Sequence, residues 1–205
     1  MSEPHPLDAA TALTPAGDGA LHGATHPAYA NMAGPFGGAT AAALLNAVLI
    51  DARRLADPIA LTVNFCGAIA DGGFEITPRL IRGGKSTQHW SIELTQNGAI
   101  AATASVVCGA RRPTWSHFPA KPPRAPGPAD VASMPAAGRT KWVESYDMRF
   151  VEGDLGRFPR KDGVLHSAHS LLWMQDVPAR PLDFLALAAL TDAFFVRIMH
   201  VRGTM

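Results

Sequence analysis

Between residues 58 and 109 the chain alternates apolar and polar residues with a period of two. Because successive side chains of a strand point to opposite faces, four such runs predict four half-buried strands. Short breaks that contain glycine separate the runs at residues 71–73, 83–85 and 96–98. Loops of this length join antiparallel neighbours, so we predict a curled antiparallel meander. The residues expected on one face of the first three strands are Leu61, Val63, Phe65, Phe74, Ile76, Leu80, Trp90, Ile92 and Leu94.

A different pattern precedes the strands, from Gly38 to Leu55. Nearly every residue there is small or apolar, no proline interrupts the run, and Asn46 is its first amide or charged residue. This composition predicts a helix that is covered on most of its faces. An apolar helix followed by such a sheet indicates an α+β fold in which the antiparallel sheet wraps around the helix.

The pattern stops after Arg112 and resumes near Lys141. Residues 113–140 are rich in proline and alanine, which predicts an extended linker on the surface. Beyond it, residues 141–153 and 165–177 resemble strands, and residues 180–201 resemble a second, nearly all-apolar helix. We therefore divide the chain into an N-terminal tail (1–20), a first unit (21–112), the linker (113–140) and a second unit (141–205).

The two apolar helices resemble each other. Ala42–Val48 aligns with Ala188–Phe194, and the alignment sets Asn46 opposite Asp192. Duplication of one structural unit explains the match, whereas a chance likeness between alanine-rich helices is the alternative. If duplication is correct, the strands that follow the second helix would begin near Met205, and the second unit would be incomplete within these 205 residues.

Charge and hydropathy narrow the classes of partner. The chain has 18 Lys and Arg residues against 17 Asp and Glu residues, without a run of like charge, so we expect neither nucleic acid nor a membrane as partner. The longest apolar run, residues 39–50, is shorter than the roughly 20 residues that cross a bilayer. The N-terminus lacks the pattern of a secretory signal. These features predict a cytoplasmic protein with a small, mostly neutral ligand.

The cysteines and histidines do not predict a metal site. Cys66 and Cys108 lie in apolar strand-like runs without Cys-x-x-Cys spacing, which indicates reduced thiols in the core. Two pairs of histidines are three or four residues apart, but in strand-like segments this spacing does not bring their rings together. These pairs are His22 with His26 and His166 with His169.

Several segments together resemble a known family. They are "GPFGG" at the start of the first helix, "LTVNFCGAI", "FEITPRLIRGGKST" and "IELTQNGAIAATASV" in the strands, and "PLDFLALAALTDAFF" at the second helix. Their order and spacing are similar to those of acyl-CoA thioesterases of the thioesterase II type, which are double hotdog proteins. The resemblance implies that each unit is a hotdog, an antiparallel sheet around a central helix. It also implies hydrolysis of acyl-coenzyme A without a metal or other cofactor, and a homo-oligomer.

The resemblance implies a catalytic role for one residue of the second helix. The family's catalytic aspartate matches Asp192, and its partners, a Thr or Ser and a Gln from later strands, would lie beyond Met205. Gln96 is the first-unit counterpart of that glutamine. Burial among apolar neighbours would raise the pKa of Asp192 and make it a better base, although a structural aspartate is the alternative. Asp183 stands at the start of its helix and is expected to cap it.

Other residues are candidates for substrate binding. Gly37 and Gly38 open a helix whose N–H groups could stabilise the thioester oxyanion, or they only allow a tight turn into the core. Arg82 and Lys85 flank a turn where cations could meet the phosphates of coenzyme A, or they are simply solvated. Asn46 cannot act as a base, so we expect it to hydrogen-bond in the core or to line an acyl pocket.

The sequence thus predicts an acyl-CoA thioesterase in which Asp192 activates a water molecule. A non-catalytic protein of the same fold that binds acyl-CoA is the alternative, because the expected partners of Asp192 are missing from the 205 residues. A hotdog hydratase would need an Asp and His pair that the sequence does not place.

Overall fold

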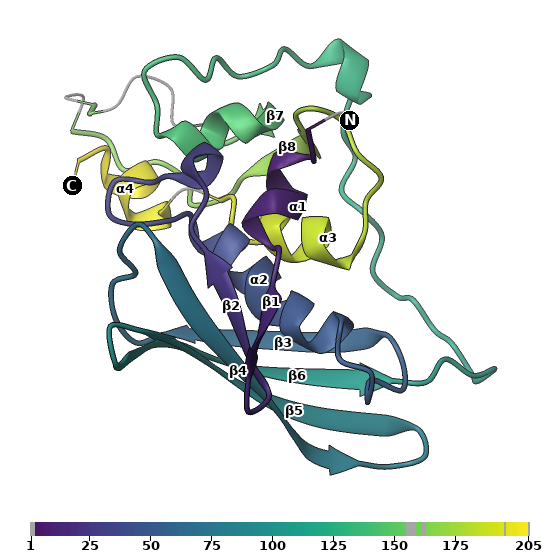
Figure 1. Ribbon diagram of the computed structural model, residues 1–205. Helices are drawn as coiled ribbons and strands as arrows, with labels where there is room; N and C mark the ends of the chain where they lie inside the picture. The colour runs from purple at the N-terminus through teal and green to yellow at the C-terminus, as the bar shows by residue number, and fades with distance from the viewer. Residues whose placement is uncertain (1–2, 155–158, 161–162, 195, 205) are drawn as a thin grey trace.

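A six-stranded antiparallel sheet lies against the helix α2 (Gly37–Leu49) in the computed structural model, which describes residues 3–154, 159–160, 163–194 and 196–204 (Figure 1). The strand order is β1-β2-β4-β5-β6-β3. The bounds of the strands are Thr14–Gly17 for β1, Ala20–Ala24 for β2, Pro58–Phe65 for β3, Gly73–Gly83 for β4, Thr87–Gln96 for β5 and Ala99–Gly109 for β6.

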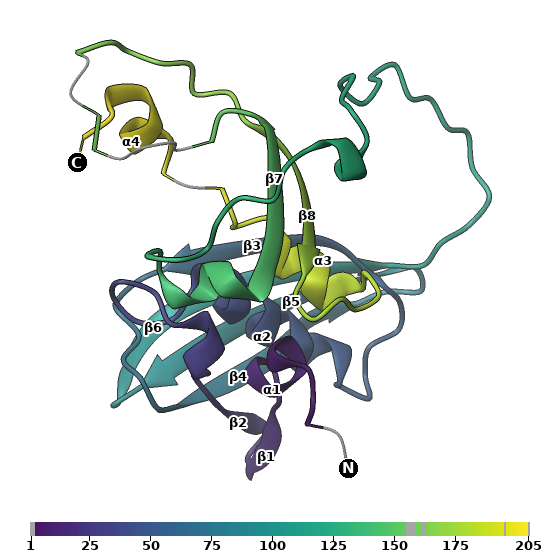
Figure 2. The same cartoon turned by 90° about the horizontal axis from the view of Figure 1, so that it is seen from above.

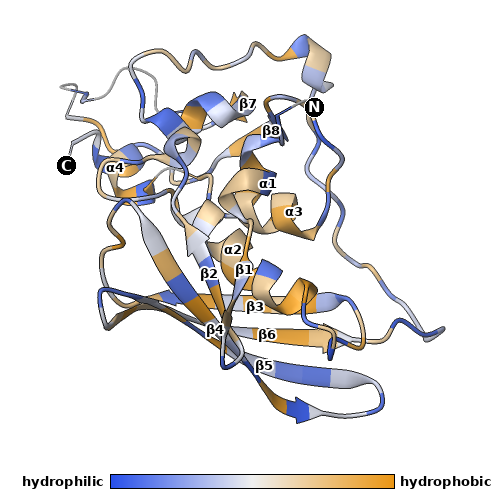
Figure 3. Cartoon of the chain, in the orientation of Figure 1, coloured by the Kyte–Doolittle hydropathy of each residue, from blue (hydrophilic) through white to orange (hydrophobic). Residues whose placement is uncertain are grey.

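The helix α2 and the inner face of the sheet form the main core. Leu44 and Val48 of α2 are fully buried, as are Ile76, Ile92 and Leu94 of the sheet. Each such side chain contributes about 1.5–3 kcal/mol by leaving water. Figure 3 shows that hydrophobic residues dominate α2. The prediction of an antiparallel sheet wrapped around a central apolar helix is therefore confirmed.

The helix α2 ends earlier than the sequence pattern predicts. Its last residue is Leu49, whereas the apolar run suggested a helix to Leu55. The Asp51 side chain accepts hydrogen bonds from the backbone N–H and from Nε of Arg53, at 2.8 and 2.9 Å. Arg54 Nε donates to the Leu49 carbonyl at 3.1 Å. These local side-chain bonds compete with continued helix, and they close it before the apolar residues end.

The strand order corrects part of the predicted meander. The strands β4, β5 and β6 follow one another as expected, but β3 pairs with β6 instead of β4. The N–H groups of Cys66 and Gly67 both donate to the Ala101 carbonyl, at 2.9 and 3.0 Å, and turn the chain out of the sheet. The strand β2 takes the place beside β4. Loop length alone did not reveal this crossing because residues 66–72 join strands that are not neighbours.

The expected N-terminal tail contains regular structure. Residues 1–2 lie outside the described part, but α1 (Pro6–Ala10) and β1 follow, and Leu7 is fully buried in the core. His5 caps α1 through Nδ1, which accepts the Leu7 N–H at 3.1 Å. A five-residue helix is unstable alone and depends on tertiary packing, which a periodicity search does not detect.

The second unit begins with a hairpin and a helix that packs on α2. The hairpin strands are β7 (Tyr146–Glu152) and β8 (Leu171–Asp176), and α3 (Phe184–Leu190) lies beside α2 (Figure 2). The helix expected over residues 180–201 is in fact two, because α4 (Arg197–Arg202) is separate from α3. Phe195 of that segment lies outside the described residues. Short 3-10 helices occur at η1 (Pro27–Tyr29), η2 (Pro128–Asp130) and η3 (Lys141–Ser145).

The remaining segments connect these elements. Residues 110–127 have no helix or strand and are exposed. The rest of the predicted linker, residues 128–140, is not a free extended segment, because it contains η2 and the Met134 N–H donates to the Met148 carbonyl of β7 at 2.7 Å. None of the described helices combines the length and the apolar composition that crossing a membrane requires.

Candidate active site

Asp192 lies in the turn that follows α3, not within the helix as the sequence pattern suggested. The helix closes because Thr191 Oγ1 donates to the Ala188 carbonyl at 2.8 Å. The Asp192 N–H then bonds to the Ala189 carbonyl at 3.3 Å, three residues back instead of four. A side-chain bond to the last turn and tighter backbone bonds are typical of helix ends.

The carboxylate of Asp192 lies at the N-terminus of α2, in the other unit. A β-carbon added to Gly37 would be 2.6 Å from Asp192 Oδ2. The Gly38 backbone amide donates a hydrogen bond to the carboxylate. Phe36, which precedes α2, provides no side-chain cap. The second unit therefore supplies an acid to exposed N–H groups of a first-unit helix, an arrangement that the helix dipole favours.

Two opposing effects set the basicity of Asp192. Burial raises the pKa of its carboxyl group, and the hydrogen bond from the Gly38 backbone lowers it, with burial the larger effect. Although the residue as a whole is exposed, its acidic end lies against α2. A raised pKa makes the carboxylate a stronger proton acceptor than a solvated aspartate.

The two glycines permit this contact, as the sequence predicted for a close approach. A β-carbon on Gly38 would collide with the Ala189 carbonyl of α3 and with the Phe36 ring. A β-carbon on Gly37 would meet Asp192 and the ring of Phe65, whose Cζ atom would be 3.1 Å away. Only glycine lets the backbones of α2 and α3 come this close.

An aromatic cluster fixes the N-terminus of α2 against the second unit. The rings of Phe36 and Trp142 stack with centroids 4.3 Å apart and planes inclined by 7°. Tyr29 and Tyr146 pack around Phe36 in stacked and edge-on contacts. The backbone N–H of Trp142 donates to the Ala30 carbonyl at 3.1 Å. Because these residues come from both units, they also fix where the second unit holds Asp192.

Asn46 lies near the other end of α2 and is not part of this arrangement. Its Nδ2 donates to the Thr11 carbonyl at 2.8 Å, just after α1. Of the two roles left open by the sequence, the hydrogen bond within the folded core is the one observed. Here α1 also reaches the start of α3, since Arg180 Nη2 bonds to Asp8 at 2.7 Å and to Asp183 at 2.9 Å.

Asp183 has the structural role that its position predicts. It is the N-cap of α3, and its Oδ1 accepts the Ala186 N–H at 2.8 Å. The cap satisfies one of the N–H groups that a helix start leaves without a partner.

Arg82 and Lys85 lie far from Asp192. Both are exposed near the β4–β5 turn. The register aligns Arg82 with Ala60 of β3 through β5 and β6, whereas Phe65 is at the opposite end of that strand. Ala60 and Phe65 are five residues apart along β3, so Arg82 and Phe65 are separated by about 17 Å in the strand direction. The structure therefore does not bring these cations to the Asp192 site.

Gln96 braces a loop of the first unit. Its Oε1 accepts the Ala70 N–H at 2.8 Å, and its Nε2 donates to the carbonyls of Ala70 and Gly73 at 2.9 and 3.0 Å. These three bonds hold the chain between β3 and β4, so the side chain has a structural function here.

The thiols and histidines do not form a site. Cys108 is buried as expected, but the prediction for Cys66 is wrong, because this residue follows the end of β3 and is exposed. His26 Nδ1 accepts the Ala28 N–H at 3.2 Å and caps η1. Within the ranges that the structure describes, no three His, Cys, Asp or Glu residues are placed to hold a metal ion.

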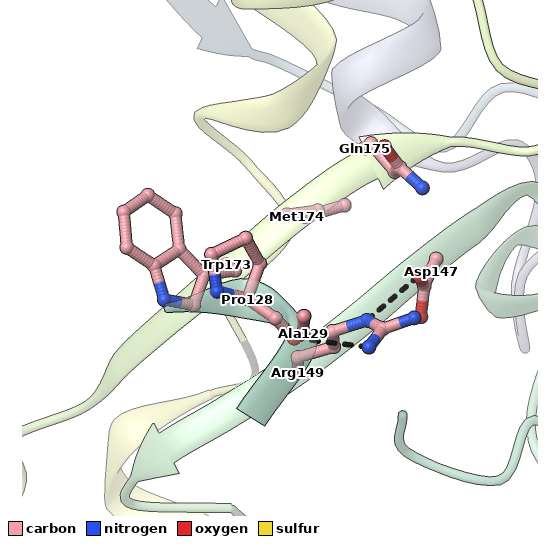
Figure 4. A pocket seen from close by; sticks show the side chains of 7 residues that line it. All are labelled: Pro128, Ala129, Asp147, Arg149, Trp173, Met174 and Gln175. Atoms are coloured by element: carbon pink, nitrogen blue, oxygen red, sulfur yellow. Dashed lines mark hydrogen bonds and ion pairs between the residues drawn. The ribbon is translucent and has the colours of Figure 1, made fainter. Parts of the chain in front are cut away.

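A pocket of about 380 Å³ lies between η2 and the β7–β8 hairpin (Figure 4). Arg149 Nε donates to Asp147 Oδ2 at 2.9 Å, and its Nη1 donates to the Pro128 carbonyl at 2.9 Å. Trp173 Nε1 donates to the Pro126 carbonyl, also at 2.9 Å. These bonds attach the end of the linker to the hairpin. The polar side chains that line the pocket therefore have a structural role in this attachment.

Comparison with solved structures shows the fold. The chain is similar to a conserved protein of unknown function with a hot dog fold from Alicyclobacillus acidocaldarius, with 40% identity, a TM-score of 0.88, and coverage of 98% of this chain and 73% of that one. A candidate thioesterase II from Thermobifida fusca has 18% identity and a TM-score of 0.78, with coverage of 95% of this chain and 73% of that one. An acyl-CoA thioesterase II from Mycobacterium marinum has 20% identity and a TM-score of 0.67, with coverage of 91% of this chain and 68% of that one.

Comparison with protein families is more specific. No curated protein matches the sequence. The acyl-CoA thioesterase N-terminal domain matches residues 25–109, and the acyl-CoA thioesterase C-terminal domain matches residues 120–205. The two matches follow each other in the order of the two predicted units and together include both central helices. With its double hotdog fold, the chain therefore belongs to the acyl-CoA thioesterase family.

Proposed function

We propose that the protein hydrolyses acyl-CoA thioesters and that Asp192 is the general base. The observation that carries this proposal is the position of the Asp192 carboxylate on the N-terminus of α2, with a raised pKa and a hydrogen bond from Gly38. Family membership supports the substrate class. A partly desolvated carboxylate beside helix N–H groups combines a proton acceptor with donors for a developing negative charge.

In the proposed reaction, Asp192 accepts a proton from a water molecule while the water oxygen bonds to the thioester carbonyl carbon. The negative charge that develops on the carbonyl oxygen is stabilised at the N-terminus of α2. Since Gly38 donates to Asp192, Gly37 is the glycine whose N–H we assign to this oxyanion. The carbon–sulfur bond then breaks, and the coenzyme A thiolate takes up the proton. Water and thioester balance the reaction to acid and thiol, so it requires no redox cofactor.

A specific observation favours a second candidate, a protein that binds acyl-CoA without cleaving it. The helix α2 has no side-chain cap of its own, and Asp192 can act as that cap. In this case the carboxylate stabilises the contact between the two units and has no chemical role.

The substitution Asp192→Asn separates the two candidates, because asparagine caps a helix as well as aspartate does but is not a base. We expect thiol release from acyl-CoA to fall at least about 100-fold with no loss of thermal stability. Asp183→Asn, the same change at the cap of α3, is the matched control and should keep activity. If Asp192→Asn cleaves acyl-CoA as fast as the unchanged protein, Asp192 is a cap and the proposed mechanism is wrong.

A further inference from the structure

Phe65 is an aromatic residue beside Asp192 that the fold does not use in its core. It is the last residue of β3, and 54% of its surface is exposed. The earlier residues on the same face of the strand, Leu61 and Val63, pack against the core. Single exposed hydrophobic side chains are common, and this chain has others, so exposure alone assigns no function. Phe65 differs from them by its position beside Asp192.

Phe65 and Asp192 reach the same glycine. A β-carbon on Gly37 would be 3.1 Å from Phe65 Cζ and 2.6 Å from Asp192 Oδ2. The ring and the carboxylate therefore lie next to each other at the start of α2, one contributed by β3 and the other by the turn after α3.

The backbone holds Phe65 in this place. Phe65 pairs with Ala102 of β6. Directly after it, the N–H groups of Cys66 and Gly67 donate to the Ala101 carbonyl. The backbone of Phe65 is therefore held on one side by the strand pairing and on the other by these two hydrogen bonds. A residue held in this way can present its ring in one direction, as a binding surface must.

We propose that Phe65 determines the acyl preference of the site, as the apolar wall against which the first carbons of the acyl chain pack. The inference rests on the proposed function. A thioester attacked by water on Asp192 must place its carbonyl carbon within about 3–3.5 Å of that water. The acyl chain and the pantetheine arm extend from this carbon in different directions. An exposed aromatic ring favours contact with the acyl chain, because that chain is apolar. The coenzyme A arm, with its amides, then points away from Phe65.

The test compares, by calorimetry, the binding of free coenzyme A and of a thioether analogue of octanoyl-coenzyme A, which the proposed activity does not cleave. Binding is measured to the unchanged protein, to Phe65→Ala and to Ile59→Ala. Ile59 is a matched control because it lies on the same strand and is 53% exposed, but it is about 20 Å from Phe65 along the strand. We expect the unchanged protein to prefer the octanoyl analogue over free coenzyme A, Phe65→Ala to reduce that preference about tenfold, and Ile59→Ala to retain it.

Rates of hydrolysis give a second measurement. For Phe65→Ala we expect kcat/KM to fall about tenfold with octanoyl-coenzyme A and less than about twofold with acetyl-coenzyme A. An equal fall with both substrates, or no preference for the acyl ligand in the unchanged protein, overturns the inference. The proposed hydrolysis is tested separately from the role of Phe65. A protein that binds the octanoyl analogue through Phe65 but cleaves no thioester would support the role of Phe65 in acyl binding and refute the hydrolysis.

Discussion

A β-carbon on Gly37 would stand 2.6 Å from Asp192 Oδ2, so an acid from the second unit and a helix start from the first unit form one arrangement. Neither unit contains both parts. The glycine pair and the acid are far apart in the sequence, and the packing of α3 on α2 brings them together.

Gly37→Ala is expected to reduce activity while the protein stays folded. The new β-carbon would meet Asp192 Oδ2, which is the end of a side chain and can move away. Alanine also favours a helix over glycine by about 0.5–1 kcal/mol, which offsets the strain. We expect kcat for acyl-CoA to fall about tenfold or more, since a displaced base loses its geometry. Urea unfolding should give a midpoint close to that of the unchanged protein.

Gly38→Ala, one residue further, is expected to act on stability instead. Its β-carbon would collide with the Ala189 carbonyl on the backbone of α3, which cannot turn away as a side chain can. Overpacking of this kind costs about 1–3 kcal/mol. The measurement is the free energy of unfolding in urea. A Gly38→Ala protein as stable as the unchanged one would show that α2 and α3 lie further apart than described.

The pH dependence of hydrolysis should report the raised pKa of Asp192. A base works only when ionised, so kcat/KM should fall as the pH decreases through this pKa. Because burial raises it, the fall should be centred above the ordinary aspartate value of 3.8. The measurement is a profile of log kcat/KM from about pH 3 to pH 8. A rate that falls only at or below pH 3.8 would contradict the burial of the carboxyl group.

Asp176→Asn should stabilise the protein at neutral pH. Asp176 is buried, and within the described residues its Oδ1 has no hydrogen-bond partner. Burial raises its pKa, while the nearby His5 and Arg180 lower it and Asp183 and Asp8 raise it. The folded state thus binds this proton more tightly than the unfolded chain, so stability decreases as the pH rises from the ordinary value through the raised one.

Asparagine removes that dependence. Thermal unfolding of Asp176→Asn should show a gain at pH 7 that shrinks as the pH falls through the raised pKa and is absent below about pH 4. A variant that is less stable at pH 7 would mean that His5 and Arg180 compensate the charge in full.

Leu7→Ala tests whether the N-terminal segment is part of the fold. Leu7 is fully buried, and replacing a buried leucine by alanine costs about 2–5 kcal/mol. Met32→Ala, at a residue that is 75% exposed, is the control and should change the free energy of unfolding by less than about 0.5 kcal/mol. Equal stability of the two variants would indicate that α1 does not pack as described.

The elements with a local pattern could be predicted from the amino-acid sequence. The periodicity of two located β4, β5 and β6, and the apolar run located α2, because alternation and helical composition reflect which faces a segment buries. The capping role of Asp183 also followed from its position before an apolar helix. The family resemblance came from the order of such segments along the chain.

The features that depend on contacts between distant segments could not be predicted in this way and became visible in the folded chain. Such features are the pairing of β3 with β6, the burial of α1 and the hydrogen bond of Asn46 to Thr11. The exposure of Phe65 is another, because alternation makes it look like a core residue. Above all, the Asp192 carboxylate lies beside the start of α2 because α3 packs on α2. Docking depends on the shapes of two faces, and a local pattern of polar and apolar residues does not contain that information.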